Sequence, residues 1–166
     1  MTDRRQILKH LNDLLQSQRI RDYCPNGLQV QGRDDIQYII TGVTANQALI
    51  DAAIERGADA ILVHHGYFWK GEDATITGIK RERLKALLQH DINLLAYHLP
   101  LDVHPELGNN AQLAKVLQLS VEGPIDANDL SKPGNVGRLP NPMTGREFST
   151  WIGQKLQRQP LHIGED

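Results

Sequence analysis

Cysteine is almost absent from this chain of 166 residues: Cys24 is the only one, so no disulfide can form within the chain. That usage fits a reducing compartment. Two kinds of apolar segment are also missing. No apolar stretch follows the polar N-terminal residues as in a secretory signal, and no apolar run approaches the roughly 18 residues of a membrane span. We therefore expect a cytoplasmic protein without a membrane partner.

A strong charge of either sign is missing as well. Lys and Arg number 18 and Asp and Glu number 20, so the formal net charge is −2. No broad basic surface is therefore expected to attract a nucleic acid, and we predict no nucleic-acid partner. The most basic stretch, 80–85, falls on a predicted helix and is interpreted as a solvated helix face.

Several catalytic motifs are absent, and each absence excludes one kind of binding or catalytic site. The sequence has no G-x-G-x-x-G motif after a predicted strand and no P-loop, so it predicts neither a dinucleotide site nor a P-loop phosphate site. Cys24 precedes Pro25 in a turn and has no base near it in the sequence. We therefore do not expect Cys24 to act as a nucleophile, because a catalytic thiol needs a neighbouring group that activates it.

Short apolar runs alternate with amphipathic segments along most of the chain. Apolar spacing predicts helices over 4–18, between Thr44 and Gly57, over 80–90 and over 110–119, and strands over 36–42, 59–64 and 92–98. A capping box from Thr44 to Gln47 is expected to open the second helix. Strands that are apolar almost throughout and alternate with helices are typical of an α/β fold with a mostly parallel sheet and helices on both faces.

Two adjacent histidines, His64 and His65, close the apolar run that begins at Ala60. Imidazole is the commonest metal ligand near neutral pH, and past the last paired residue of a strand two neighbouring side chains can turn toward one pocket. The next predicted strand leads to His98 and Asp102. In parallel sheets, ligands sit outside the carboxyl ends of the strands. These residues therefore predict a shared metal site.

Each of these residues also has a structural interpretation, which the sequence leaves open. His64 and His65 can be core or surface residues, and Asp102 can bond backbone amides of its own loop. His98 can be a half-buried histidine, or a residue that orients a metal ligand from behind rather than binding the metal. The aromatic run 67–69, directly after the histidine pair, can form one wall of a pocket for a planar ligand such as a nucleobase, pack within its loop, or contact another subunit.

Composition changes toward the end of the chain. Pro and Gly recur over 120–143, as in a linker or short irregular strands, and a second capping box, from Thr144 to Glu147, predicts one more helix. We therefore divide the chain into an α/β metal-site domain over 1–120 and a second segment over 121–166. The second segment is interpreted as a linker plus the start of a further α/β segment that is cut short.

Five motifs in order make the chain similar to one known family. They are Pro25-Asn-Gly-Leu-Gln-Val30, Thr41-Gly-Val-Thr44, Val63-His-His-Gly-Tyr-Phe-Trp-Lys70, His98-Leu-Pro-Leu-Asp102 and Gly108-Asn-Asn-Ala-Gln-Leu113. With these motifs the chain resembles the GTP cyclohydrolase 1 type 2 homologue family, also called the Nif-three-like family, over nearly its whole length. The resemblance implies the Nif-three-like α/β fold.

The resemblance also implies a cytoplasmic protein that has a dinuclear divalent-metal site and assembles as a homohexamer. The ligands that the first half of the family supplies map onto His64, His65 and Asp102. Zinc, iron and manganese all suit such a mixed set of imidazoles and carboxylate. Family members are longer, and a His and a Glu four apart complete their metal pair. Nothing here matches those two, so the chain resembles an amino-terminal portion whose fold is incomplete at the carboxyl end.

Three hypotheses about function follow. The first is a metal-dependent hydrolase that activates water on the metal and acts on a nucleotide-like substrate. The resemblance implies hydrolytic opening of the guanine ring of GTP, and no catalytic residue beyond the metal ligands is assigned. The second is a carrier or insertion protein that holds metal ions without turnover. The third is a structural piece that binds metal poorly and contributes oligomer contacts.

Overall fold

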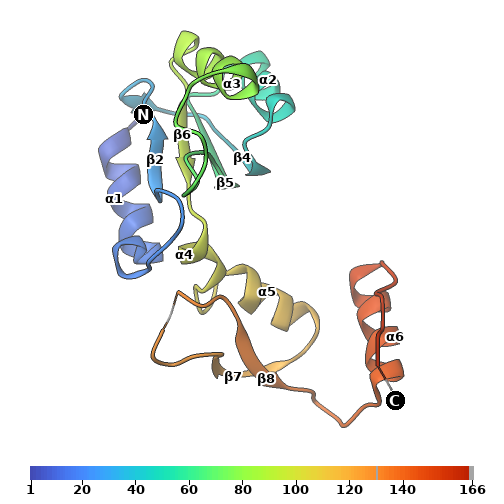
Figure 1. The fold of residues 1–166 in the computed structure, drawn as a ribbon. Helices are drawn as coiled ribbons and strands as arrows, with labels where there is room; N and C mark the ends of the chain where they lie inside the picture. The colour runs from blue at the N-terminus through green and yellow to red at the C-terminus, as the bar shows by residue number, and fades with distance from the viewer. Residues whose placement is uncertain (130, 165–166) are drawn as a thin grey trace. The chain divides into compact units, whose positions relative to one another are not determined.

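The structure, a computed structural model, describes residues 1–129 and 131–164 of the chain. It consists of two compact units, Met1–Leu101 and Asp102–Asp166. Figure 1 shows the elements of both units in chain order. The domain boundary at residue 120, which the composition indicates, stays a prediction.

The first unit contains a four-stranded sheet in the order β2-β6-β5-β4. Its strands are β2 (Gly27–Val30), β4 (Ile39–Thr44), β5 (Ala60–His65) and β6 (Asn93–Ala96). β4, β5 and β6 run parallel, whereas β2 pairs antiparallel with β6. The sheet is therefore mixed and mostly parallel, which confirms the α/β class that the apolar strands predict; the antiparallel strand β2 was not predicted.

Helices connect these strands, and one short pair of strands lies beside them. The helical segments are α1 (Arg4–Leu15), the 3-10 turn η1 (Ser17–Arg19), α2 (Gln47–Glu55), α3 (Gly78–Gln89) and α4 (Leu99–Asp102). The two-residue strand β1 (Thr2–Asp3) pairs antiparallel with β3 (Asp35–Ile36). Helix α4 ends at the first residue of the second unit.

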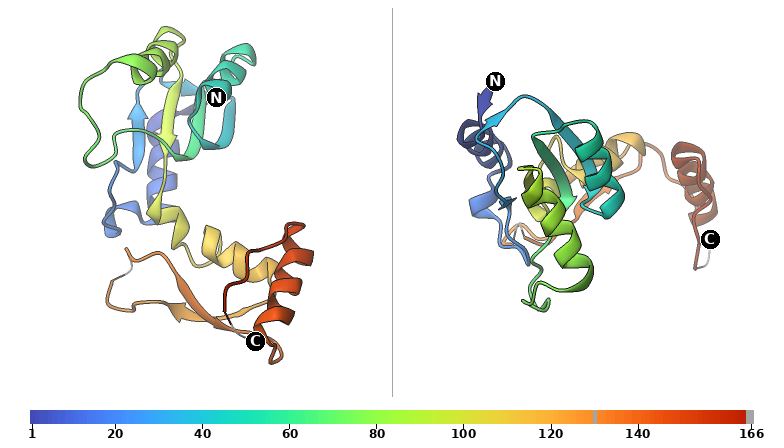
Figure 2. Two further views of the ribbon diagram at one scale, coloured as in Figure 1. Left: turned by 45° about the vertical axis from the view of Figure 1, so that its right-hand side comes forward. Right: turned by 90° about the horizontal axis from the view of Figure 1, so that it is seen from above.

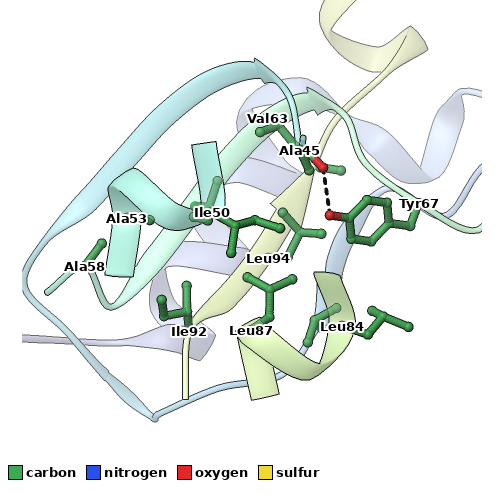
Figure 3. Close-up of a cluster of buried hydrophobic side chains, with 13 residues drawn as sticks. Ala45, Ile50, Ala53, Ala58, Val63, Tyr67, Leu84, Leu87, Ile92 and Leu94 are labelled. Carbon is green, nitrogen blue, oxygen red and sulfur yellow. Dashed lines mark hydrogen bonds between the residues drawn. The ribbon is translucent and has the colours of Figure 1, made fainter. Parts of the chain in front are cut away.

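Helices cover both faces of the sheet, as predicted. Along β5 the side chains alternate: Ile61 and Val63 belong to a core cluster with α2 and α3, whereas Ala60 and Leu62 pack with residues of α1. Figure 3 shows side chains of α2 and α3 together with Val63 and Leu94 in the first cluster. The views in Figure 2 show the sheet between α1 and the pair α2 and α3. This packing holds β5 and β6 side by side and so fixes where their carboxyl ends lie.

Local backbone geometry corrects three predicted boundaries. The helix predicted over 4–18 ends at Leu15, because the next residue has a left-handed φ of 48°. The second helix is capped by Asn46, whose side chain accepts a backbone hydrogen bond over 2.9 Å. Thr44, the predicted cap, is instead the last residue of β4. The strand predicted over 36–42 is divided between β3 and β4.

Among the described residues after α4, the second unit contains two helices and a two-stranded sheet. Its elements are α5 (Asn109–Val116), β7 (Ser120–Pro124), β8 (Asn135–Arg138) and α6 (Gly145–Leu156), and β7 pairs antiparallel with β8. The predicted capping box is confirmed, since Glu147 N donates to Thr144 Oγ1 and Thr144 N donates to the Glu147 carboxylate. Trp151 Nε1 donates to Leu117 O over 3.1 Å and ties α6 to the end of α5. No helix in the described part of the chain is long and apolar enough to cross a membrane.

A carboxylate, Asp59, lies just before β5 at the amino end of the strand. It accepts hydrogen bonds from Gln37 N and Tyr38 N over 2.8 and 3.0 Å. It also pairs with Arg33, whose Nη1 lies 2.9 Å from Asp59 Oδ1. Burial acts to raise the pKa of Asp59, but the two backbone hydrogen bonds and Arg33 outweigh it, so the pKa lies below its ordinary value of 3.8.

Replacing Asp59 with asparagine is therefore expected to lower the free energy of unfolding by about 1–3 kcal/mol at neutral pH, since a hydrogen-bonded charge is lost. A carboxyl group with a lowered pKa in the folded chain stabilises it above the unfolded pKa of about 4. That contribution is lost as the pH falls through the folded pKa. Urea unfolding near neutral pH and near pH 3 measures the difference between wild type and Asp59→Asn, which should shrink at the lower pH. An equal difference at both would contradict this account.

Candidate metal centre

Three histidines meet where β5 and β6 end. His64 and His65 are the last two residues of β5, and His98 follows β6 by two residues. The two strands are parallel neighbours, with Val63 paired to Ala96, so their carboxyl ends lie at the same edge of the sheet. One ligand atom from each histidine lies within 4.8 Å of the others. The ring centroids are 4.4 Å apart for His64 and His65, 5.0 Å for His64 and His98, and 5.6 Å for His65 and His98.

Hydrogen bonds made by the Nδ1 atoms orient these rings. His64 Nδ1 donates to the carbonyl oxygen of Tyr97 over 3.0 Å, and His98 Nδ1 donates to the carboxylate of Asp22 over 2.9 Å. His65 Nδ1 and Thr44 Oγ1 are 3.3 Å apart. For His64 and His98, Nε2 is therefore the nitrogen that a metal ion would take, which is how metal-binding histidines are commonly held. The arrangement fits a metal ion that takes imidazole ligands.

Asp22 is a residue that sequence reasoning missed. Its side chain is 3% exposed and accepts hydrogen bonds from His98 Nδ1, Asn26 Nδ2 and Leu99 N, each over 2.9 Å. Burial acts to raise the pKa of Asp22, but the hydrogen bonds from these groups and from Tyr23 N outweigh it, so the pKa lies below its usual value. The sequence predicts a turn at Cys24 and Pro25, but that pattern does not indicate the contact of Asp22 with His98.

Cys24 lies close to the same histidine. Asp22, Cys24 and His98 each offer a ligand atom, and these atoms also lie within 4.8 Å of one another. Burial, and then the charge of Asp22, raise the pKa of the Cys24 thiol to about 11. At neutral pH the thiol is therefore protonated, in line with the expectation that it does not act as a nucleophile.

Gly66 follows His65 at a point of close packing. A Cβ atom here would lie 2.1 Å from Gln29 Oε1 and 2.7 Å from Ala96 Cβ. Gln29 Oε1 accepts a hydrogen bond from Tyr67 N over 2.7 Å, which ties the segment after the histidines to β2. The glycine that follows the histidine pair thus allows the chain to pass close to β2 and β6.

The aromatic run after the histidines divides between core and site. Tyr67 is buried and its hydroxyl donates to Ala45 O over 2.7 Å, and Phe68 packs against the same core cluster. Trp69 instead lies edge-on to His98, with ring centroids 4.9 Å apart. Tyr23 adds a second ring near His98, at 5.8 Å. Packing is therefore the correct interpretation for Tyr67 and Phe68, whereas Trp69 borders the three histidines.

Asp102, the predicted carboxylate ligand, is the last residue of α4 and belongs to the second unit. Its Oδ1 accepts a hydrogen bond from Asn109 Nδ2 over 2.8 Å. The structure thus brings His64, His65 and His98 together, and the approach of Asp102 to them stays a prediction.

Comparison with known proteins identifies relatives. Residues 2–166 match the family described as Duf34/NIF3 (NGG1p interacting factor 3). A Haemophilus influenzae protein named GTP cyclohydrolase 1 type 2 homolog is 58% identical over 151 residues, which are 91% of this chain and 60% of that protein. A Vibrio cholerae protein of the same name is 55% identical over 156 residues, which are 94% of this chain and 62% of that protein.

Solved structures agree with this match. The protein ybgI, described as of unknown function, has a TM-score of 0.88 and 52% identity, and the match covers 96% of this chain and 63% of the ybgI chain. TTHA1606 from Thermus thermophilus has a TM-score of 0.81 and 37% identity, and the match covers 96% of this chain and 64% of TTHA1606. This chain spans less than two thirds of the length of these relatives, and it matches their amino-terminal portion. Because the family match extends over nearly the whole chain, the chain belongs to the Duf34/NIF3 family of GTP cyclohydrolase 1 type 2 homologues.

Proposed function

We propose that this chain binds a divalent metal ion through His64, His65 and His98, with Asp102 as a carboxylate ligand, as part of a metal-dependent hydrolase. The observation that carries the proposal is the meeting of three imidazoles at the carboxyl ends of two parallel strands, with ligand atoms within 4.8 Å of one another. Zinc, iron and manganese suit such a set of ligands. We propose two metal ions per complete site, with the remaining ligands supplied by the part of the relatives that this chain does not span.

The surroundings of the histidines support a role in hydrolysis. A bound divalent metal lowers the pKa of a coordinated water and so supplies a nucleophile at neutral pH. The residues of this chain hold the imidazoles in place, because Tyr97 O and Asp22 accept hydrogen bonds from His64 and His98. Trp69 and Tyr23 place aromatic surface beside His98. Aromatic side chains favour a planar ligand, so a nucleobase is the substrate part that we expect here.

The name of the bacterial relatives supports a nucleotide as substrate, since they are called homologs of a GTP cyclohydrolase. We propose hydrolytic opening of the guanine ring of GTP for the longer form, as a homohexamer in the cytoplasm. Both the assembly and the location follow from the resemblance to the family.

Titration of the purified 166-residue chain with Zn²⁺, with elemental analysis and a GTP turnover assay on the same sample, tests the proposal. We expect the chain to bind one metal ion weakly, no second metal ion and no ring opening, because the three histidines and Asp102 are too few ligands for two metals. The longer form should bind two and turn over GTP. Two tightly bound metals with GTP turnover in this chain would contradict the need for further ligands. Metal without turnover in the longer form would favour a carrier over a hydrolase.

A further inference from the structure

Each of the two carboxylate oxygens of Asp22 accepts two hydrogen bonds. Oδ1 accepts from His98 Nδ1 over 2.9 Å and from Tyr23 N over 2.6 Å. Oδ2 accepts from Asn26 Nδ2 and from Leu99 N, both over 2.9 Å. Four donors therefore point at one nearly buried carboxylate, and one of them is a ring nitrogen of the metal centre.

The loop that contains Asp22 also holds the backbone of His98. Asn26 Oδ1 accepts a hydrogen bond from His98 N over 2.8 Å, and Asp22 holds the next backbone amide, Leu99 N. The loop lies there because β2 pairs antiparallel with β6, with Gly27 opposite Ala96. The residues before β2 therefore run beside the residues after β6. The ring and the backbone of His98 are both fixed from this loop.

We propose that Asp22 is a positioning residue of the metal centre, which keeps the proton of His98 on Nδ1 and so presents Nε2 to the metal ion. This inference rests on the proposed metal-binding function. A carboxylate can only accept a hydrogen bond, so the imidazole facing it must donate, and a carboxylate behind a metal-binding imidazole fixes its orientation and raises its basicity.

In a second arrangement of the same residues, a metal ion would take the place of the His98 proton and bind Asp22, Cys24 and His98. The hydrogen bonds favour the positioning role. All four donors to Asp22 are protein groups within 2.6–2.9 Å of its oxygens, and a cation between Asp22 and His98 would displace one of them. The experiment below distinguishes the positioning role of Asp22 from coordination of the metal by Cys24.

The Asp22→Asn variant tests the proposal, because an amide has one acceptor oxygen where the carboxylate has two. Of the four donors, the two backbone amides cannot become acceptors, and Asn26 could do so only by giving up its bond to His98 N. His98 can adapt by moving its proton from Nδ1 to Nε2. We therefore expect nitrogen-15 spectra of the metal-free chain, recorded in alkaline solution where the imidazole is neutral, to show the Nδ1–H tautomer of His98 in the wild type and the Nε2–H tautomer in the variant.

Zinc affinity gives the second readout. The Asp22→Asn variant should bind Zn²⁺ about 10- to 100-fold more weakly than the wild type, as expected when the partner behind a metal-binding imidazole is lost. Asp59→Asn is the matched control. It removes another carboxylate of the same unit that accepts two backbone hydrogen bonds, and it should leave the His98 tautomer and the zinc affinity unchanged.

Three results would overturn the proposal: a wild-type His98 protonated on Nε2, an Asp22→Asn variant with unchanged tautomer and zinc affinity, or a thiolate-to-cobalt charge-transfer band on Co²⁺ loading that Cys24→Ser removes. The last result would place the metal at Cys24. If the wild type binds no zinc at all, the proposed function fails. The tautomer of the metal-free chain then still decides whether Asp22 positions His98, so the two failures are distinguishable.

Discussion

Replacing His64 and His65 together with alanine is expected to lower the affinity of the chain for Zn²⁺ by more than about 100-fold. The loss of a single partner behind a metal-binding imidazole already costs about 10- to 100-fold, and this double variant removes two of the three imidazoles themselves. Isothermal titration with Zn²⁺, together with circular dichroism to confirm the fold, measures the effect.

The matched control replaces His10 and His90, two exposed histidines outside the histidine cluster, with alanine. This variant loses the same number of imidazoles and should bind zinc like the wild type. If both double variants lose zinc equally, or if His64→Ala/His65→Ala keeps the wild-type affinity, the metal is held elsewhere and the proposed centre is wrong.

Replacing Leu94 with alanine is expected to lower the free energy of unfolding by about 2–5 kcal/mol, the usual range for a buried leucine. Leu94 is fully buried, belongs to the core cluster with α2 and α3, and pairs with Ile61 in the neighbouring strand. Figure 3 shows Leu94 among the other side chains of this cluster, so its truncation is expected to leave a cavity in the core that supports β5 and β6. Urea unfolding monitored by circular dichroism measures the loss.

Leu88→Ala serves as the control for this prediction, because Leu88 on α3 is 58% exposed. The same chemical change at this surface position should alter the free energy of unfolding by less than about 0.5 kcal/mol. Equal losses in the two variants would mean that the cluster around Leu94 does not stabilise the fold as described.

The central strands could be predicted from the sequence, and the edge strand β2 could not. β5 and β6 contain continuous apolar residues, which buried parallel strands require, and their helices repeat apolar residues at helical spacing. β2 has only four residues and follows turn residues, so its pattern is too short to distinguish it from a loop. Its pairing partner, β6, lies more than 60 residues further along the chain.

Part of the candidate site could likewise be predicted from the sequence, namely its histidines, whereas the contact made by Asp22 could not. The adjacent histidines could be recognised because they close an apolar strand, and His98 because it follows the next strand. The contact of Asp22 with His98 joins residues 76 positions apart and depends on the pairing of β2 with β6, so it could not be derived once β2 was missed. The sequence also could not predict which residues of the aromatic run 67–69 are buried. Tertiary packing decides that Tyr67 lies in the core and that Trp69 lies beside His98.

Anomalous diffraction from crystals of the zinc-loaded chain tests the central claim most directly. The account predicts a zinc ion about 2.0–2.1 Å from one nitrogen of each of His64, His65 and His98. A zinc ion bound by other residues, or no zinc at these three imidazoles under saturating conditions, would contradict it.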